Sequence, residues 1–254
     1  MRPPPEGAGL SADRPAQAPI ALQQSFWDNW NAQHREAGVG EVSSDQKRVV
    51  LHWLAEIGRT DLDILDVGCG AGWLDPSLKQ FGVVTATDLS ADVLARIRAR
   101  IPQVNYIAGD FMELPFEPSS FDVAVSLEVL AHVADQRAFI AKIHSLLRPG
   151  GWLMLATQNR PVLERHNMNS IQPAAPGQLR RWTDAAELRA LVEPQFEVAE
   201  LFTKTPRASQ GPLKLINARP VRQAMRVLVG EGFERMKERM GLGWTLMCLA
   251  KKRP

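Results

Sequence analysis

Cysteine is scarce in this sequence, and long apolar runs are missing. Cys69 and Cys248 are its two cysteines, and each falls in or beside a predicted core strand. A disulfide framework is therefore not expected, and a reducing compartment is favoured. No apolar run approaches the roughly 18 residues of a membrane-spanning helix, and residues 1–7 lack the apolar core of a secretory signal. These absences predict a cytoplasmic protein with no transmembrane segment.

An excess of charge of one sign is also lacking, because the formal net charge is only +2 at pH 7. Proteins that bind nucleic acids usually concentrate Lys and Arg on one face. We therefore expect no nucleic-acid partner, and a small molecule suits the composition at least as well. The 45% of hydrophobic residues in 254 is enough for one catalytic-size domain with a sizeable core.

Composition divides the chain into a tail and one domain. Residues 1–20 are rich in proline and small residues, a composition typical of disordered segments. Residues 21–254 are predicted to form the domain, with N-terminal helices at 21–60, a ligand-binding core at 61–157 and loop, helix and last strands at 158–254. Three aromatic residues are expected on one face of a short helix near its start, namely Phe26, Trp27 and Trp30.

Short apolar runs alternate with segments of helical period, which is typical of crossover units on a parallel sheet. The predicted strands are 62–67, 83–88, 105–108, 121–127, 152–157, 196–202 and 244–250. A helix is expected from Asp135 up to the Arg148–Gly151 turn. Asp184 followed by Glu187 resembles a capping box that opens another helix. The proline-containing segment from Asn159 to Arg181 is predicted to be a functional loop.

A glycine-rich turn gives the strongest local signal. Residues 64–73 read Ile-Leu-Asp-Val-Gly-Cys-Gly-Ala-Gly-Trp, a strand that enters a Gly-x-Gly-x-Gly turn and then a helix. Glycine permits the close backbone approach that a nucleotide cofactor needs. A tight turn with no ligand is the alternative. Trp73 and Asp75 stand where a dinucleotide fingerprint requires glycine, which argues against a nicotinamide enzyme.

Asp88 ends the second predicted strand, 20 positions after Gly68. That offset suits an acid that accepts hydrogen bonds from two ribose hydroxyls. The alternative is a cap for the following helix, but Ser90 can serve as that cap without Asp88. The ribose interpretation is therefore preferred.

These motifs resemble the class I S-adenosylmethionine-dependent methyltransferases, in particular the small-molecule branch of the ubiquinone and menaquinone pathways. Residues 65–72 are similar to the family's first motif and Asp88 to its ribose-binding acid. Residues 109–116 resemble the adenine segment, 121–133 the fourth-strand motif and 146–151 the turn before the fifth strand. The motifs occur in the family's order, which is more specific than any one of them.

The resemblance implies a fold and a cofactor. The fold is α/β and Rossmann-like: a doubly wound, seven-stranded, mostly parallel sheet with an antiparallel last strand and an N-terminal helical lid. The cofactor is S-adenosyl-L-methionine, with S-adenosyl-L-homocysteine as product, lying across the carboxyl ends of the first strands. The implied cofactor-binding residues are Asp66, Gly68, Cys69, Gly70, Gly72, Asp88, Leu89, Asp110, Phe111 and Leu127.

Within that set, the resemblance gives individual residues separate roles. Asp66 would orient the glycine turn or the methionine amine. Asp110 would accept a hydrogen bond from the adenine amine, and Phe111 would line the adenine ring. The backbone at Ser126 or Leu127 would hold the amino-acid end of the cofactor.

A methyltransferase that acts on a hydroxyl also needs a base. The candidates are His34, His132 and His166; a hydrogen bond from His132 to a neighbouring loop is an equally good interpretation of that residue. Gln158-Asn159-Arg160 stands where a catechol-type magnesium site would need an Asp pair, so no metal is expected. The helix with Phe26, Trp27 and Trp30 is the predicted lid, and the loop 159–181 the predicted acceptor pocket; ordinary core packing of the aromatics is the alternative.

The segment 213–240 is basic and partly amphipathic, which fits a peripheral membrane element, a cover over the pocket or a solvated helix. The predicted function is therefore methyl transfer to O or N, with C still open, of a small hydrophobic or aromatic metabolite. RNA or protein methylation is an alternative, but no base-methylation motif follows the fourth strand. A non-catalytic cofactor binder of the same fold is the other alternative.

Overall fold

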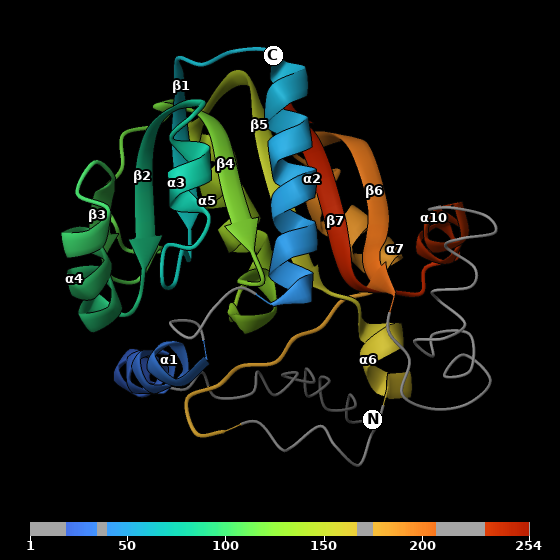
Figure 1. Cartoon of the computed structure of the whole chain (residues 1–254), viewed down its shortest axis with the longest axis horizontal. Helices are drawn as coiled ribbons and strands as arrows, with labels where there is room; N and C mark the ends of the chain where they lie inside the picture. The colour runs from blue at the N-terminus through green and yellow to red at the C-terminus, as the bar shows by residue number, and fades with distance from the viewer. Residues whose placement is uncertain (1–18, 35–39, 167–174, 207–231, 254) are drawn as a thin grey trace, which may run out of the picture.

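A computed structural model describes residues 19–34, 40–166, 175–206 and 232–253 (Figure 1). The side chains of His34, His166 and residues 233–235 lie outside this description. So do residues 1–18 of the predicted tail and most of the basic segment 213–240. Among the described residues, no helix combines the length and apolar character needed to cross a bilayer.

Seven strands form one sheet in the order β3-β2-β1-β4-β5-β7-β6. Strands β1 to β5 run parallel, and β7 is antiparallel to both β5 and β6. The strands are β1 (Leu62–Val67), β2 (Gly82–Asp88), β3 (Asn105–Ala108), β4 (Phe121–Leu127), β5 (Leu147–Gln158), β6 (Phe196–Pro206) and β7 (Gly243–Lys252). The predicted doubly wound, mostly parallel sheet is confirmed.

Helices cover both faces of the sheet (Figure 1). Trp53 of α2 (Glu41–Ile57), Leu78 of α3 (Asp75–Leu78) and Ile97 of α4 (Ala91–Arg100) belong to the apolar cluster on one face. Phe139 of α5 (Gln136–Leu146) and Leu188 of α7 (Ala185–Val192) belong to the cluster on the other. Both layers are dry, because these side chains are at most 1% exposed, and their burial supplies the main driving force for folding.

Helix starts follow the capping chemistry read from the sequence. The Ser90 side chain accepts from the Val93 amide at the start of α4, and Asp135 accepts from Ala138 at the start of α5. Asp184 and Glu187 form the predicted capping box of α7, with bonds of 2.9 and 3.0 Å. Each cap satisfies an amide that the helix itself leaves without a partner.

Three differences from the sequence prediction stand out. β5 begins at Leu147 instead of 152, because Leu147 pairs with Phe121 before a register shift in which β5 carries the extra residues. β6 continues to Pro206 instead of ending at 202. Residues 160–166 form a helix, α6, inside the segment predicted as a loop. Arg160 at its start contacts the carboxylates of Asp184 and Glu187 at 2.6 and 2.9 Å, so an ion pair with a distant helix fixes it.

Helix α1 (Ile20–His34) lies across the carboxyl ends of the parallel strands (Figure 1). It is one of the two helices expected within 21–60. Helix α10 (Gly232–Arg239) flanks β6 at the other end of the sheet. Met236 and Met240 near α10 are 49% and 64% exposed, whereas Lys237 is buried. Membrane contact through 213–240 stays a prediction, because most of that segment lies outside the described residues.

Candidate functional site

A cavity of about 1160 Å³ opens at the carboxyl ends of β1, β2 and β4. Ligands of open α/β sheets bind at this edge. Backbone and side chains from the glycine turn, the end of β2 and the segment after β3 line one side. Helix α1, residues 40–43, the segment after β4, and residues from α6, 178–182 and β7 line the rest. The volume exceeds the usual range of about 300–1,000 Å³ for one small ligand, so the cavity has room for more than one small molecule.

The glycine turn after β1 has the backbone that its sequence predicts. Gly68, Gly70 and Gly72 all have positive φ angles, of 76°, 54° and 66°. A Cβ on Gly68 would lie 2.3 Å from the Val129 side chain, so no larger residue fits there. The amides of Gly68 and Cys69 donate to the Thr87 carbonyl at 2.8 and 2.9 Å, which fastens the turn to β2. Gly68, Cys69 and Gly70 line the cavity.

Asp88 stands at the cavity with its carboxylate fixed by two backbone amides. Gly70 N donates to Oδ2 and Ser90 N to Oδ1, each at 2.9 Å. Burial raises the pKa of Asp88, and the two amides oppose that rise. Each carboxylate oxygen has two lone pairs, so each keeps capacity to accept one more hydrogen bond. This arrangement suits a pair of vicinal hydroxyls, and neighbouring Leu89 also lines the cavity.

Two predicted cofactor residues do not line the cavity. Asp66 is only 4% exposed and lies beneath the glycine turn, where it pairs with the buried Asp75 carboxyl. Burial first, and then the charge of Asp75, raise the pKa of Asp66 well above its ordinary value. Tyr106 donates to Asp75 Oδ2 at 2.7 Å. A Cβ on Gly72 would meet that same oxygen at 2.8 Å, so Gly72 makes room for the acid pair.

The segment after β3 supplies the residues expected around an adenine ring. Asp110 and Phe111 both line the cavity. Asp110 Oδ1 accepts from the Met112 amide at 3.0 Å, which holds the turn. The Phe111 ring packs edge-on against Phe139 of α5, with centroids 5.4 Å apart. Packing against Phe139 in the core therefore fixes the orientation of the Phe111 ring at the cavity.

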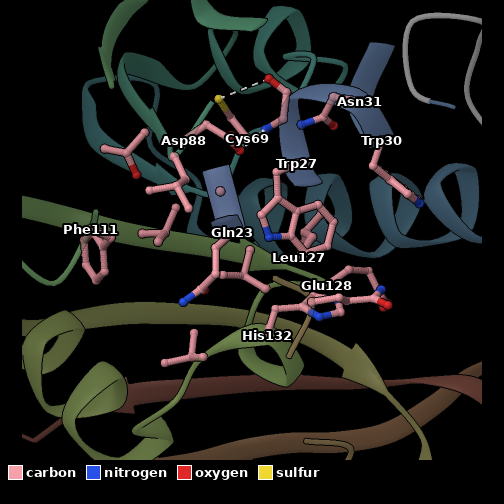
Figure 2. Close-up of a pocket in the computed structure, with 18 of the residues that line it drawn as sticks. Gln23, Trp27, Trp30, Asn31, Cys69, Asp88, Phe111, Leu127, Glu128 and His132 are labelled. Carbon is pink, nitrogen blue, oxygen red and sulfur yellow. Dashed lines mark hydrogen bonds between the residues drawn. The ribbon is translucent and has the colours of Figure 1, made fainter. Parts of the chain in front are cut away.

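Helix α1 contacts several of these turns at once. Asn31 Oδ1 lies 3.2 Å from where a Cβ on Gly70 would stand. Ser90 Oγ donates to Asp28, which joins α1 to the start of α4. Trp27 packs edge-on against His132 with centroids 4.7 Å apart, and against Trp30 at 5.6 Å (Figure 2). The helix therefore spans from the glycine turn to the segment after β4.

Of the three aromatic residues predicted to face the site, Trp27 and Trp30 line the cavity and Phe26 does not. Phe26 instead packs edge-on against the Trp27 ring, 4.8 Å away. Phe26 therefore contributes to the site indirectly, by packing against a cavity-lining ring. Sequence reasoning missed Gln23 and Asn31 on the same helix, which Figure 2 shows beside Trp27; both lie one helical turn from it.

His132 is the candidate base whose side chain the structure describes. Its Nδ1 lies 2.6 Å from the Leu179 carbonyl oxygen, and a carbonyl only accepts, so Nδ1 carries a proton. Burial lowers the pKa of His132, which favours the neutral ring with a lone pair on Nε2. His132 lines the cavity. The predicted hydrogen bond to a neighbouring loop is thus present. His34 ends α1 and His166 ends α6, and their side chains lie outside the described residues.

The cavity wall is rich in tryptophan, and Glu128 is among the lining acids that sequence reasoning did not single out. Five of the chain's seven tryptophans line the cavity, namely Trp27, Trp30, Trp73, Trp182 and Trp244. Glu128 follows β4 with a φ of 64°, and Leu127 lines the cavity just before it. Trp182 and Trp244 are far apart in sequence, and no local pattern links them.

Known proteins resemble this chain in sequence and fold. Residues 65–155 match a family described as methyltransferase domain. A ubiquinone biosynthesis O-methyltransferase of Pseudomonas aeruginosa is 36% identical over 214 residues, or 78% of this chain and 88% of that protein. A protein of Mycolicibacterium smegmatis, named as a probable S-adenosylmethionine-dependent methyltransferase, is 34% identical over 140 residues. That match spans 54% of this chain and about half (53%) of the relative.

A solved structure also resembles the chain. The Burkholderia thailandensis 1,6-didemethyltoxoflavin-N1-methyltransferase, with bound 1,6-didemethyltoxoflavin and S-adenosylhomocysteine, has a TM-score of 0.61. It is 23% identical to this chain, and the alignment covers 96% of this chain and 98% of that one. At this identity the likeness concerns the fold.

Proposed function

We propose that this chain, which belongs to the class I S-adenosylmethionine-dependent methyltransferases, methylates a hydroxyl oxygen of a small aromatic molecule. The chain is an enzyme, and S-adenosylmethionine is its cofactor. That cofactor supplies an electrophilic methyl group on a sulfonium sulfur. The identity of the acceptor and the roles of single residues are the proposal.

The residues around the glycine turn suit this cofactor. Gly68 and Gly70 present backbone without side chains to the cavity, and glycine adopts their positive φ angles freely. The Asp88 oxygens keep lone pairs for the two ribose hydroxyls, and Asp110 and Phe111 suit the adenine. We assign the methionine end to the backbone around Leu127. Asp66 and Gly72 then act indirectly, by shaping the turn from below.

His132 is the reason that we propose a hydroxyl acceptor, because a hydroxyl needs a base to remove its proton. Its Nδ1 proton is committed to the Leu179 carbonyl, so Nε2 is the atom that can take a proton. The low pKa keeps the ring neutral near pH 7, the state that a base needs. General-base catalysis of this kind contributes roughly 10²–10⁴-fold to a rate. The observation on which the proposal rests is this neutral histidine in a cavity lined by tryptophans.

The tryptophan-rich wall supports an aromatic acceptor. Trp30, Trp182 and Trp244 line the cavity together with Leu163 of α6. Aromatic rings pack well against flat apolar molecules, with preferred offset or edge-on geometries. The Pseudomonas aeruginosa relative is named for oxygen methylation, which favours O over N for this chain as well. We also propose that the protein acts in the cytoplasm and that helix α1 is a lid over the cavity.

The first test is calorimetric titration with S-adenosylhomocysteine. The native chain should bind it, and Asp88→Ala should bind at least tenfold more weakly, because the ribose hydroxyls lose a charged acceptor. A panel of phenols and aromatic amines is then incubated with methyl-labelled cofactor. Labelled methyl ethers support the proposal; labelled amines with unlabelled phenols overturn the choice of oxygen. Binding without any labelled product would favour a non-catalytic binder.

The role of His132 is tested with His132→Asn. The Asn amide nitrogen can still donate to the Leu179 carbonyl, but nothing replaces Nε2. We expect kcat for the acceptor to fall about 100-fold while S-adenosylhomocysteine affinity stays within about threefold. In the native chain, kcat/KM should fall with acid below an apparent pKa lower than 6.5, since the ring must stay neutral. A variant with native kcat and an unchanged pH profile would remove His132 from the mechanism.

A further inference from the structure

Glu128 has a backbone conformation that its residue type disfavours. Its φ of 64° lies in the left-handed region, which residues with a Cβ populate sparsely. Ser119 and Thr205 are the other non-glycine residues with positive φ among those described, and neither lines the cavity. Unfavourable backbone conformations persist where the surrounding structure holds them, and they concentrate at functional sites. The conformation of Glu128 thus favours a functional role for its carboxylate.

The Glu128 carboxylate is held by two distant elements. Gln46 of α2 donates from Nε2 to Oε1 at 2.5 Å, and Thr245 of β7 donates from Oγ1 to the same oxygen at 3.2 Å. Gln46 also donates to Thr245 at 3.4 Å. Gln46 is 1% exposed and Thr245 is fully buried, so the donors belong to the core. Two core donors therefore fix where a cavity-lining acid stands.

Glu128 directly follows Leu127, to which the methionine end is assigned, and lies apart from the glycine turn and from Asp88. Glu128 and His132 follow β4, and Figure 2 shows both apart from Cys69 and Asp88. Trp244 precedes Thr245 directly in β7, so the strand that positions Glu128 also supplies an aromatic wall. A carboxylate accepts hydrogen bonds and donates none when ionised. Because Oε1 already accepts from Gln46 and Thr245, a ligand group that donates a hydrogen bond suits this carboxylate.

We propose that Glu128 anchors the acceptor: its carboxylate, positioned by Gln46 and Thr245, accepts a hydrogen bond from a hydroxyl or amine of the bound aromatic molecule. This rests on the proposed function, since it assigns the acceptor to the tryptophan-lined part of the cavity. Glu128 then selects acceptors that carry a donor group. Sites built to bond a hydroxyl reject the analogue that lacks it far more strongly than sites that sense size alone.

The test compares two ligands that differ in one donor. Native protein saturated with S-adenosylhomocysteine is titrated with 2-naphthol and with 2-methoxynaphthalene, and binding is followed by ligand-observed NMR. We expect 2-naphthol to bind at least tenfold more tightly. Glu128→Gly removes the carboxylate and relieves the positive φ, because glycine adopts it freely. In that variant the ratio of affinities should fall to about 1–2. A native ratio near one, or a Glu128→Gly ratio equal to the native one, would overturn the proposal.

Two further variants separate this role from a structural one. Glu113→Gly also removes a cavity-lining acid, but on the side of the segment after β3, and should keep the native ratio. Gln46→Met removes a donor that holds Oε1 without touching the cavity wall, and should lower the ratio severalfold. Affinity for S-adenosylhomocysteine reports whether each variant is folded. If Glu128→Gly does not fold, the Gln46→Met ratio decides, and an unchanged value there counts against the proposal.

The readout is binding and needs no methyl transfer. Discrimination between the two ligands without any turnover would contradict the proposed function and leave the anchor standing. Turnover of phenols together with equal binding of 2-naphthol and its methyl ether would contradict the anchor and leave the proposed function standing.

Discussion

At the scale of single residues, the site combines expected and unexpected acids. Asp88 lies where its sequence distance from the glycine turn predicts, and its carboxylate oxygens accept hydrogen bonds from two backbone amides. Asp66 belongs to the same motif, yet its carboxyl is buried against Asp75 beneath the turn. A sequence motif fixes which strand end a residue occupies. It does not fix whether that side chain points into the cavity or into the core.

The buried acid pair makes a prediction about pH and stability. The pKa of Asp66 is raised in the folded chain, so folding retains a proton that the unfolded chain loses above its ordinary pKa of about 3.9. Stability therefore falls as pH rises from that value toward the folded pKa. Asp66→Asn cannot ionise and should escape this loss. We expect its melting temperature to exceed the native one at pH 8 by about 2–4 °C for each kcal/mol recovered, and by less at pH 4.5.

Thermal unfolding followed by circular dichroism at the two pH values measures this difference. A gap between native and Asp66→Asn that does not change with pH would show that the Asp66 carboxyl ionises freely in the folded chain. The same experiment with S-adenosylhomocysteine added reports whether the acid pair also affects the glycine turn.

At the scale of elements, α1 joins parts of the site that the sheet alone leaves separate. Asp28 accepts from Ser90 Oγ at the start of α4, and Asn31 lies against Gly70. Trp27 reaches His132 beyond β4. Because α1 precedes the sheet in the chain, these contacts are long-range and depend on the whole fold. The aromatic pattern predicts an amphipathic helix, while the contacts identify what it covers.

Asp28→Ala tests whether the position of α1 matters for cofactor binding. The substitution removes the acceptor for Ser90 Oγ but leaves every cavity-lining side chain in place. We expect affinity for S-adenosylhomocysteine to fall about three- to tenfold. The full worth of a hydrogen bond to a charged group, about 1.5–3 kcal/mol, is the upper limit of this effect. Calorimetry measures it. Asn29→Ala is the matched control: Asn29 is exposed on the same helix and bonds only within α1, to the Ser25 carbonyl. Equal affinities for the two variants would argue against the lid.

At the scale of the whole molecule, one cluster of ion pairs lies at the end of the sheet opposite the site. Arg148, at the start of β5, contacts Asp122 at 2.7 Å and Asp63 at 2.8 Å. Burial raises the pKa of Asp122, but the Asp63 amide, Arg59 and Arg148 outweigh it and hold that pKa below its ordinary value. These residues join the amino ends of β1, β4 and β5, away from the cavity at the carboxyl ends.

Arg148→Met should therefore cost stability and leave ligand binding alone. The loss at pH 7 should be about 0.5–1 kcal/mol, because both side chains of the Arg148–Asp63 pair are well exposed. A depressed pKa stabilises above the unfolded pKa, and that contribution is lost as pH falls through the folded pKa. The difference between variant and native should thus shrink toward pH 3. Urea unfolding measures it, and a tenfold change in S-adenosylhomocysteine affinity would contradict the separation.

The sequence by itself determined the strands, the helix caps and the order of the cofactor motifs. These are set by local rules: apolar runs form strands, Ser, Asp and Glu cap helices, and glycine allows the turn at residues 68–72. The predicted strands therefore agree closely with β1 to β7. Trp27, Trp30, Asp88 and His132 were all identified as site residues from such patterns.

Tertiary structure alone decided how the side of the cavity that we propose for the acceptor is built. Gln46, Glu128 and Thr245 meet although 82 and 117 residues separate Glu128 from its two partners. Burial turned Asp66 into half of an acid pair, and residues 160–166 form α6, whose first residue pairs with the distant Asp184. Hydrogen bonds and burial between segments far apart in the chain leave no trace in a local pattern. The proposed cofactor residues belong to contiguous motifs that a sequence pattern can show, whereas the proposed acceptor side is assembled from α1, α2, β4 and β7 and exists only once they have packed.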